Sequence, residues 1–501
     1  MAYNQILKVT QSPKISTKEI FAPDTSTIGD QNVQFKAPKT TRSTEESIGA
    51  DAPYIMINTV PIANVERMII DETGLVPTIR ITFTDPTGAL SGPNYPKVDP
   101  IMSVYVKTAN GKFKAIAGDF LITSIKSTLD PNLDPAGVGI NATYIMMGEL
   151  YIPKIYNNFS KSYSNKTSVA ALRELALDLD LGFSELDIDT KDSMTWINPN
   201  RNGLWMIDHI SKHAYINDDA FFDSFIDRYY NLTFVNVSNQ LIEKAEYDTT
   251  FVNHTDGSGY YPTQEMKDKD ESKWQEDLIP IMLTNDDVMR GRPEFITNYL
   301  LEGEVGRVLK SRGYRKQISY YDHTLEEEKK DTSFWVNPAK VEGQPEDSRL
   351  VPRDPILQSN LIKQWINIDY GNNHREWNAS ALINDHNAAE LNKVKLKVET
   401  SGVNFQIVRG SSIPIRIFKT VQQALDQESY KYTRPHGYED YIDAADVQNI
   451  IIDPYLSGTY YTSGIKISYD SSDRYSPFRT EFHMRRINWV PEKNLENEDA
   501  A

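Results

Sequence analysis

Alternating hydrophobic and polar positions mark the part of the chain between residues 53 and 153. In PTIRITFTD, the apolar residues Ile79, Ile81 and Phe83 alternate with polar ones, which is the period of a strand with one buried face. The stretches YIMINTV, MSVYVK and GDFLITSIK repeat this alternation, and DPTG and ANGK between them are typical of turns. The pattern predicts a small antiparallel β-barrel or sandwich.

A helical period replaces the alternation after residue 153. The stretch SVAALRELALDLDLGF has apolar residues at helical spacing, namely Val169, Leu172, Ala176 and Leu179. Thr167 is available as the N-cap, and we expect Gly182 to end the helix. A second helix is predicted in NGLWMIDHISKHAYI. Its buried positions would be Leu204, Ile207, Ile210 and Ala214. The stretch FFDSFIDRYYNLTFVNV then predicts two strands about a turn near Tyr230 and Asn231.

Strand-like stretches return further along the chain. IPIMLTN, YRKQISYYD and TSFWVN precede the linker-like stretch KVEGQPEDSRLVPRDP, and VKLKVETSG, IPIRIFK, SGIKISYD and RTEFHMRRINW follow it. We therefore predict a β-rich α+β chain of several domains. They are an extended or disordered N-terminal arm at 1–52, a first β-barrel at 53–153, a mixed α/β module at 154–245, a second β-rich block at 246–350 and a C-terminal β-rich domain at 351–501. The block at 246–350 could belong to a second barrel built from discontinuous segments.

The composition is that of a large chain rich in strands and interfaces. Its 501 residues exceed the size at which one hydrophobic core stops growing, and the 28 Tyr and 18 Phe favour strands. The formal net charge of -17 argues against a surface built to grip the phosphates of nucleic acid. Without cysteine there is no disulfide and no thiolate metal site. No apolar run approaches the length of a membrane span, and MAYNQILKVTQSP lacks the features of a signal peptide.

Acidic residues crowd around the end of the first predicted helix. They are Asp178, Asp180, Glu185, Asp187, Asp189 and Asp192. Such carboxylates can hold a cation, carry acid/base catalysis, or form a solvated surface or partner contact, and we favour the last of these. Asp187 and Asp189 would share one face of a short strand, but only Trp196 offers an aromatic wall for a sugar. Asp178 and Asp180 oppose the helix dipole, so we expect a basic partner surface beside them.

Two histidines have a spacing that can serve a metal. His209 and His213 lie four residues apart on the second predicted helix, which can place both imidazoles on one ion. The zinc-peptidase motif needs Glu after the first His, where this chain has Ile210, so a pair on the helix surface is favoured. No complete calcium loop, phosphate loop or serine nucleophile motif occurs. The sequence therefore predicts no catalytic, cofactor-binding or metal-binding residue, and a chain that is not an enzyme.

Several stretches follow one another in a distinctive order between Pro53 and Val490. PYIMINTVPI, TIRITFTDPTG, GDFLITS, GELYIPKIYNNFSKSYSNKTSVAALRELALDLDLGF and DTKDSMTWINPNRNGLWMIDHISKHAYINDDAFFDSFIDRYYNLTFVNV come first. LTN, GYRKQISYYD, INIDYGNNHREWNASALINDHNAAELNKVKLKVETSG, VRGSSIPIRIF and LSGTYYTSGIKISYD come after them. In this order the chain resembles the central baseplate hub proteins of contractile-tailed bacteriophages. The N-terminal arm lies outside the resemblance.

The resemblance implies a structural role in the virion. Hub proteins of this family form a trimeric ring in which each subunit contributes two tail-tube-like β-barrels, and the ring adapts the sixfold tail tube to the threefold central spike. The expected partners are two further copies in a homotrimer, the central spike protein, the tail tube or tube-initiator protein, and the surrounding baseplate wedge proteins. DNA would pass through the lumen without specific binding. No membrane anchor is expected, and assembly would take place in the bacterial host cytoplasm.

Two other functions stay open from the sequence. A tail-associated enzyme that degrades the cell wall would use carboxylates of the cluster between Asp178 and Asp192. A tail component that binds host carbohydrate would instead attach to host cells without other virion proteins. The tyrosine-rich composition favours the hub, because tyrosine is enriched where proteins form extensive interfaces.

Overall fold

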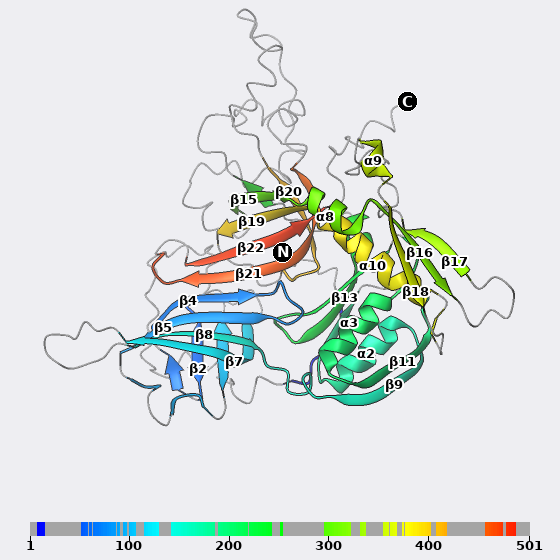
Figure 1. Ribbon diagram of the computed structural model, residues 1–501. Helices are drawn as coiled ribbons and strands as arrows, with labels where there is room; N and C mark the ends of the chain where they lie inside the picture. Colours follow the sequence, from blue (N-terminus) through cyan, green and yellow to red (C-terminus); the bar gives the residue numbers. More distant parts are fainter. Residues whose placement is uncertain are drawn as a thin grey trace, which may run out of the picture.

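Strands dominate the part of the chain that can be described. The computed structural model describes residues 8–15, 52–58, 60–62, 64–86, 88–90, 94–97, 100–106, 115–129, 142–185, 189–218, 220–242, 251–253, 295–321, 331–336, 354–359, 361–367, 373–374, 376–401, 407–417, 456–473 and 477–486. One long sheet, of 13 strands, crosses one half of the molecule, and most helices lie in the other half (Figure 1). The predicted class, a β-rich α+β chain, is confirmed.

Antiparallel strands from residues 54–150 form a first sheet block. In pairing order they are β4 (Asn64–Asp71), β5 (Thr78–Asp85), β8 (Ala142–Leu150), β7 (Ile116–Leu129), β6 (Ile101–Val106), β2 (Tyr54–Ile57) and β3 (Val60–Ile62). The predicted alternation is confirmed in β5, where Ile79, Ile81 and Phe83 are buried in the core. Among the described strands the pairings run from β4 to β3 without closing, so the barrel predicted here is an open sheet in this part of the structure.

The second sheet block combines strands from both sides of the predicted linker. In pairing order they are β20 (Ser412–Arg416), β14 (Phe251–Asn253), β15 (Phe295–Gly303), β19 (Val394–Ser401), β22 (Phe478–Arg485) and β21 (Gly458–Asp470). A further pair joins β21 back to β20, so these pairings run in a circle. The strands thus combine discontinuous segments, as the sequence left open, while the domain boundaries themselves stay predictions.

One strand pair joins the two blocks. β21 pairs antiparallel with β4, which sets Lys466 opposite Asp71 and Asp470 opposite Arg67. The result is a continuous sheet of 13 strands, with β4 and β21 side by side at its middle (Figure 1). An edge strand has a row of unpaired N–H and C=O groups, and this pair satisfies those of β4 and β21 within one chain. The two blocks therefore form one sheet instead of separate bodies.

The α/β module lies beside this long sheet. Its elements are β9 (Phe159–Lys166), α2 (Ser168–Asp178), β10 (Gly182–Glu185), β11 (Met194–Arg201), α3 (Gly203–His213), β12 (Phe222–Ile226), β13 (Asn231–Asn236) and α4 (Val237–Ile242). β11 pairs with β9, while β10, β13 and β12 form a second sheet. The free side of β10 is covered by β1 (Lys8–Gln11), a piece of the predicted N-terminal arm. Part of that arm is thus a strand of the module.

Helix α2 confirms its predicted start and corrects its predicted end. Thr167 caps the start through its side-chain oxygen, as expected. At the other end Leu179 is the C-cap and Asp180 takes the left-handed φ of 62°, so the prediction that Gly182 ends the helix was wrong. Gly182 begins β10 instead, and a Cβ there would lie 2.8 Å from the backbone oxygen of Gln11. Close packing against the Asn231 side chain of β13 and against the arm, not helix termination, requires this glycine.

The second predicted helix and the hairpin after it are confirmed. Of the predicted buried positions on α3, Ile207, Ile210 and Ala214 are buried and Leu204 is half-buried. β12 and β13 pair antiparallel, and Tyr230 takes a left-handed φ of 62° in the turn between them. The Tyr230 hydroxyl accepts a hydrogen bond of 2.9 Å from the backbone N–H of Asp119 on β7. The hairpin turn therefore docks onto the first sheet block.

A third group of elements lies between β15 and β19 in the sequence. They are α8 (Val305–Arg312), β16 (Arg315–Tyr321), β17 (Asp331–Val336), α9 (Pro355–Gln358), β18 (Leu361–Asn367) and α10 (Trp377–Leu391), and β17, β16 and β18 form a small sheet. The strands β16 and β17 were predicted, whereas α10 was missed. Its buried side includes Ser380, Asn384 and Asn387, which removes the apolar stripe that reveals a helix. The predicted strand in IPIMLTN and the acidic C-terminal tail lie outside the described residues.

Candidate functional surface

The predicted acidic cluster does not converge on one point. Four described members have partners: Asp178 pairs with Lys161, Asp180 with Lys154, Glu185 with Arg173, and Asp192 with the backbone of Ser168 and Tyr215. Asp189 is exposed and lies in no strand, and Asp187 lies outside the described residues. The described carboxylates therefore brace the module. In the described part of the chain, no group of three His, Asp or Glu residues is arranged to hold a metal ion.

The acids at the end of α2 are matched by lysines of the same chain. Lys161 Nζ lies 2.5 Å from Asp178, which also accepts a hydrogen bond of 2.9 Å from the Tyr163 hydroxyl. Lys154 Nζ lies 2.5 Å from Asp180. These cations offset the unfavourable interaction of the two carboxylates with the helix dipole. The basic surface that was expected from a partner is supplied by the chain itself.

Asp192 joins the start of α2 to the segment after α3. Its Oδ1 accepts a hydrogen bond of 2.9 Å from the backbone N–H of Ser168, and its Oδ2 accepts one of 2.9 Å from that of Tyr215. The side chain is fully buried. Both oxygens thus satisfy backbone groups that would otherwise lack a partner in the interior, which is a structural role.

Replacing Asp192 by Ala is expected to lower the free energy of unfolding by about 1–3 kcal/mol, because two buried N–H groups lose their acceptor. Asp189→Ala changes an exposed member of the same cluster and is expected to alter the free energy by no more than about 0.5 kcal/mol. Urea unfolding of the two variants measures the difference. Equal losses would contradict the structural role assigned to Asp192.

The two histidines of α3 lie in an aromatic stack against α10. The His209 ring stacks on Trp205 with centroids 4.5 Å apart. The His213 ring stacks on Trp377, the first residue of α10, with centroids 3.5 Å apart and an interplanar angle of 3°. The pair that was expected on the helix surface is therefore half-buried at a seam between the module and α10.

At this seam, ring nitrogens of two histidines and backbone carbonyls at the end of α3 form hydrogen bonds. His213 Nδ1 donates to the carbonyl of Trp377 at 3.0 Å, and His374 Nε2 donates to the carbonyl of His213 at 3.0 Å. The Asn384 amide donates to the Lys212 carbonyl at 2.8 Å. Burial lowers the pKa of His213 to about 3 and lowers the pKa of His374 below its usual value. Neutral imidazoles thus form hydrogen bonds at the C-terminal end of α3, and His213 Nδ1 is not available to a metal.

A buried ion pair joins the first sheet block to the module. Arg228, in the β12–β13 turn, places Nη1 at 3.0 and 3.1 Å from the two carboxylate oxygens of Glu72, and both side chains are buried. Arg228 Nη2 also donates to the carbonyl of Ile407 at 2.6 Å. Burial raises the pKa of Glu72, and the guanidinium of Arg228 lowers it only in part. Charges this deep are tolerated only when they are paired.

A second ion pair extends this contact to the long sheet. Arg409 Nη2 lies 3.0 Å from Asp223 of β12, and Nη1 donates to the Gly74 carbonyl beside Glu72 at 2.5 Å. The Tyr461 hydroxyl on β21 donates to the same Asp223 carboxylate at 2.9 Å. We call Glu72, Asp223, Arg228, Arg409 and Tyr461 the buried clamp. It joins both sheet blocks to the module, in addition to the β21–β4 pair that joins the blocks to each other.

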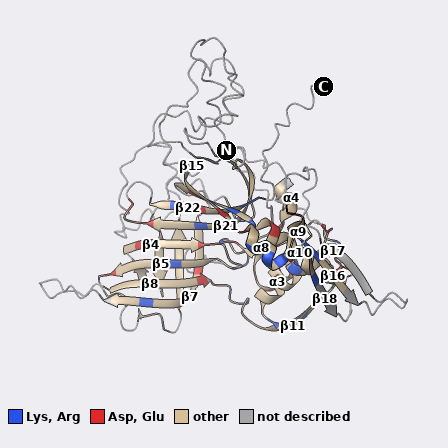
Figure 2. Cartoon of the chain, turned by 45° about the horizontal axis from the view of Figure 1, so that its top comes forward, with Lys and Arg blue, Asp and Glu red and all other residues tan. Residues whose placement is uncertain are grey.

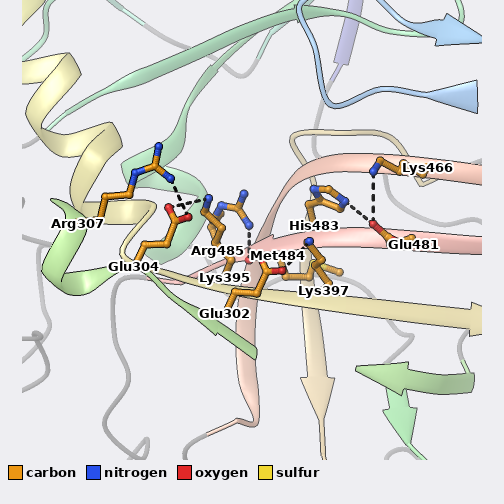
Figure 3. Close-up of polar contacts among 10 residues, drawn as sticks. All are labelled: Glu302, Glu304, Arg307, Lys395, Lys397, Lys466, Glu481, His483, Met484 and Arg485. Atoms are coloured by element: carbon orange, nitrogen blue, oxygen red, sulfur yellow. Dashed lines mark hydrogen bonds and ion pairs between the residues drawn. The ribbon is translucent and has the colours of Figure 1, made fainter. Parts of the chain in front are cut away.

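One face of the second block carries a ladder of opposite charges across β15, β19, β22 and β21 (Figure 3). Its members, here called the charge ladder, are Glu302, Glu304, Lys395, Lys397, Lys466, Glu481 and Arg485. His483 lies among them and contacts Glu481, but burial lowers its pKa and favours the neutral imidazole. Lys397 Nζ lies 2.8 Å from Glu302, and Lys395 Nζ lies 3.3 Å from Glu304. The hydrogen bond from each lysine holds the pKa of its glutamate below the usual value. Each of these lysines therefore faces an ionised carboxylate.

The charge ladder continues across the seam between the blocks. Lys466 on β21 lies 3.7 Å from Glu481 on β22 and 3.7 Å from Asp71 on β4. Arg67 on β4 lies 3.1 Å from Asp470 on β21. Figure 2 shows acidic and basic residues interspersed on these strands, with basic residues gathered near α8. The long sheet therefore presents matched charges of both signs, despite the acidic average of the chain.

The comparisons with known proteins concern structure alone. No protein-family model matches the chain, and no curated protein matches it. A tail protein of Neisseria meningitidis is 10% identical, with 88% of this chain and 98% of that one covered and a TM-score of 0.46. The 43 kDa tail protein of prophage MuSo2 from Shewanella oneidensis is 7% identical, with 87% and 99% covered and a TM-score of 0.48.

A secretion-system protein is also similar to this chain. It is an Escherichia coli component of the type VI secretion system that is itself described as similar to phage T4 tail proteins. It is 9% identical, with 88% of this chain and 77% of that one covered and a TM-score of 0.38. These three solved structures are thus described as tail and secretion-system proteins. Within the described residues, no helix is both long and apolar enough to cross a membrane.

Proposed function

We propose that the chain is a structural, non-enzymatic subunit of a phage tail baseplate, where three copies form a hub ring. The observation that carries the proposal is the edge-to-edge pair of β21 with β4, which gives every copy two sheet blocks in one continuous sheet. Three such copies present six blocks around an axis. A ring of this kind can meet a sixfold tube on one side and a threefold spike on the other.

The charge ladder supports the proposal that DNA passes along this surface without being bound. Binding to nucleic acid draws on lysines and arginines that are free to neutralise phosphates. Lys395, Lys397 and Lys466 instead face carboxylates at 3.3, 2.8 and 3.7 Å. In the proposed ring this face lines the lumen, and the net charge of -17 adds a general repulsion.

The proposed partners follow from this arrangement. The homotrimer would bind the central spike protein on one side and the tail tube or tube-initiator protein on the other. Baseplate wedge proteins would surround it, and the assembly would form in the cytoplasm of the bacterial host before it enters the virion. The buried clamp supports a rigid subunit, because its ion pairs tie both sheet blocks to the module.

The mass of the purified full chain in solution tests the proposal. The expected result is three times the chain mass of 57.1 kDa, with a further increase when the spike protein of the same virus is added. A monomer that never joins the spike would contradict the hub. Clearing of cell-wall material in a zymogram by the same preparation, lost on Asp189→Asn, would favour an enzyme, and binding to host cells by the chain alone would favour a receptor-binding component.

A further inference from the structure

Strand β1 occupies a prepared edge of the α/β module. β10 pairs in parallel with β13 on one side, and all four of its residues are buried. On its other side β1 pairs antiparallel with it, with Lys8 opposite Glu185 and Val9 opposite Ser184. Without β1, this edge would leave unpaired backbone groups beside the core, so the module needs an added strand at this position.

The same segment also donates hydrogen bonds to two backbone carbonyls that come just after α2. The backbone N–H of Lys14 donates to the carbonyl of Asp180 at 2.9 Å. The Gln11 side-chain amide donates to the carbonyl of Leu181 at 2.8 Å. These two carbonyls lie just after α2, whose own last carbonyls accept hydrogen bonds from the backbone N–H groups of Leu179, Asp180 and Leu181. Residues 8–15 therefore hold the segment that joins α2 to β10.

Gly182 gives this edge a notch that fits the arm. A Cβ built on Gly182 would meet the Asn231 side chain of β13 first, and would lie 2.8 Å from the Gln11 carbonyl oxygen and 2.9 Å from Pro13 Cδ of the arm. Distances under 3.0 Å are essentially never seen for real Cβ atoms, so a larger residue would displace both the Asn231 side chain and the arm. Backbone pairing with β10, hydrogen bonds to the segment between α2 and β10, and the space beside Gly182 thus recognise one extended segment, residues 8–15 of this sequence.

The chain between the arm and the first sheet block is long enough to reach another molecule. Between residues 15 and 52 lie about 36 residues, which extended at about 3.3 Å each span on the order of 120 Å. A folded chain of this length has a radius of gyration of about 23 Å. The edge of β10 in a neighbouring copy is therefore within reach of the arm.

We propose that in the assembled protein the β1 strand on each β10 edge comes from a neighbouring copy of this chain. Exchange of an identical segment keeps every contact described above and adds a strand pair between subunits, so it strengthens the ring without a new surface. In a closed ring each copy gives one arm and receives one. The inference rests on the homotrimer of the proposed function and assigns a role to the arm, which lies outside the hub resemblance.

The absence of cysteine from the sequence allows a direct test. One variant carries Val9→Cys and a second, with a size tag, carries Ser184→Cys; these positions lie directly opposite each other in the strand pair. The two variants are co-expressed, purified as the full assembly and oxidised under mild conditions. The expected result is a shift from monomer bands to a mixed disulfide-linked dimer on a non-reducing gel. Either variant alone is expected to remain monomeric on the gel.

A matched control uses a cysteine away from the edge. Ile197 on β11 has an exposed side chain, so Ile197→Cys is more accessible than Ser184→Cys but is not opposite the arm, which makes it a stringent control. Co-expression of Ile197→Cys with Val9→Cys is expected to give no mixed dimer. A mixed dimer of similar yield in this control would show random collision and overturn the inference.

The double variant with both Val9→Cys and Ser184→Cys separates exchange from pairing within one chain. Exchange predicts covalent dimers and trimers, whereas pairing within one chain predicts a monomer band of increased mobility. Trimeric mass in solution with only the monomer band overturns the strand exchange and leaves the hub proposal standing. Monomeric mass overturns the hub itself. Absence of any disulfide in the double variant overturns the placement of the arm on β10.

Discussion

An Arg228→Leu variant is expected to lose about 3–5 kcal/mol of unfolding free energy. The substitution removes the guanidinium that lies 3.0 Å from Glu72, so a buried carboxylate is left without its counter-charge. It also removes the hydrogen bond to the Ile407 carbonyl, which joins the module to the second block. Urea unfolding followed by tryptophan fluorescence measures the loss.

Two controls make this prediction specific to the buried clamp. Arg67 also pairs with a carboxylate, that of Asp470, but its side chain is 69% exposed, so Arg67→Leu is expected to cost no more than about 1 kcal/mol. A double variant with Arg228→Leu and Glu72→Leu removes both charges and is expected to recover much of the loss. Equal effects of Arg228→Leu and Arg67→Leu would refute the clamp.

Lowering the pH from 7 to 5 is expected to destabilise the folded chain by about 2 kcal/mol through His213 alone. Burial lowers the pKa of His213 to about 3 in the folded state, whereas an unfolded histidine titrates near about 6.5. Below the unfolded pKa, the unfolded chain binds a proton that the folded chain does not. Stability is therefore complete above pH 6.5 and falls progressively toward the folded pKa.

The His213→Phe variant isolates this contribution. Phenylalanine keeps a ring against Trp377 but does not titrate, so its unfolding free energy is expected to fall by about 2 kcal/mol less between pH 7 and 5. Burial lowers the pKa of His209 and of His374 as well, so some acid sensitivity remains in the variant. For His209, the Asp208 carboxylate partly raises the pKa again, while the Lys212 ammonium lowers it further. Parallel profiles for the variant and the parent would contradict this assignment.

Local patterns predicted the individual elements well. The alternation in PTIRITFTD predicted β5 with its buried face, and the helical spacing from Val169 to Leu179 predicted α2 with Thr167 as its cap. These features depend on neighbours within one strand or one turn, so the sequence reveals them directly. Helix α10 was missed because it buries amides that bind carbonyls of α3. A pattern of apolar residues cannot reveal burial that is satisfied by hydrogen bonds to a distant helix.

The candidate chemistry was judged correctly only in part. The acids between Asp178 and Asp192 were expected to be mainly solvated or to meet a partner, and the structure matches the first two acids with Lys161 and Lys154. Asp192, in contrast, is fully buried on two backbone N–H groups. Nothing in the sequence separates it from its exposed neighbour Asp189, because burial depends on the segment after α3 that packs over it.

The sequence by itself determined many of the strands, the helices α2 and α3, the acidic and cysteine-free composition, and the resemblance to hub proteins. Tertiary structure alone decided which strand edges pair, namely β21 with β4 and β1 with β10. It also decided which buried charges meet, as Arg228 and Glu72 do. The physical reason is that these contacts join residues far apart in the chain through backbone edges and buried charges. Neither kind of group leaves a periodic signature in the sequence, so only the folded chain shows how two sheet blocks become one sheet.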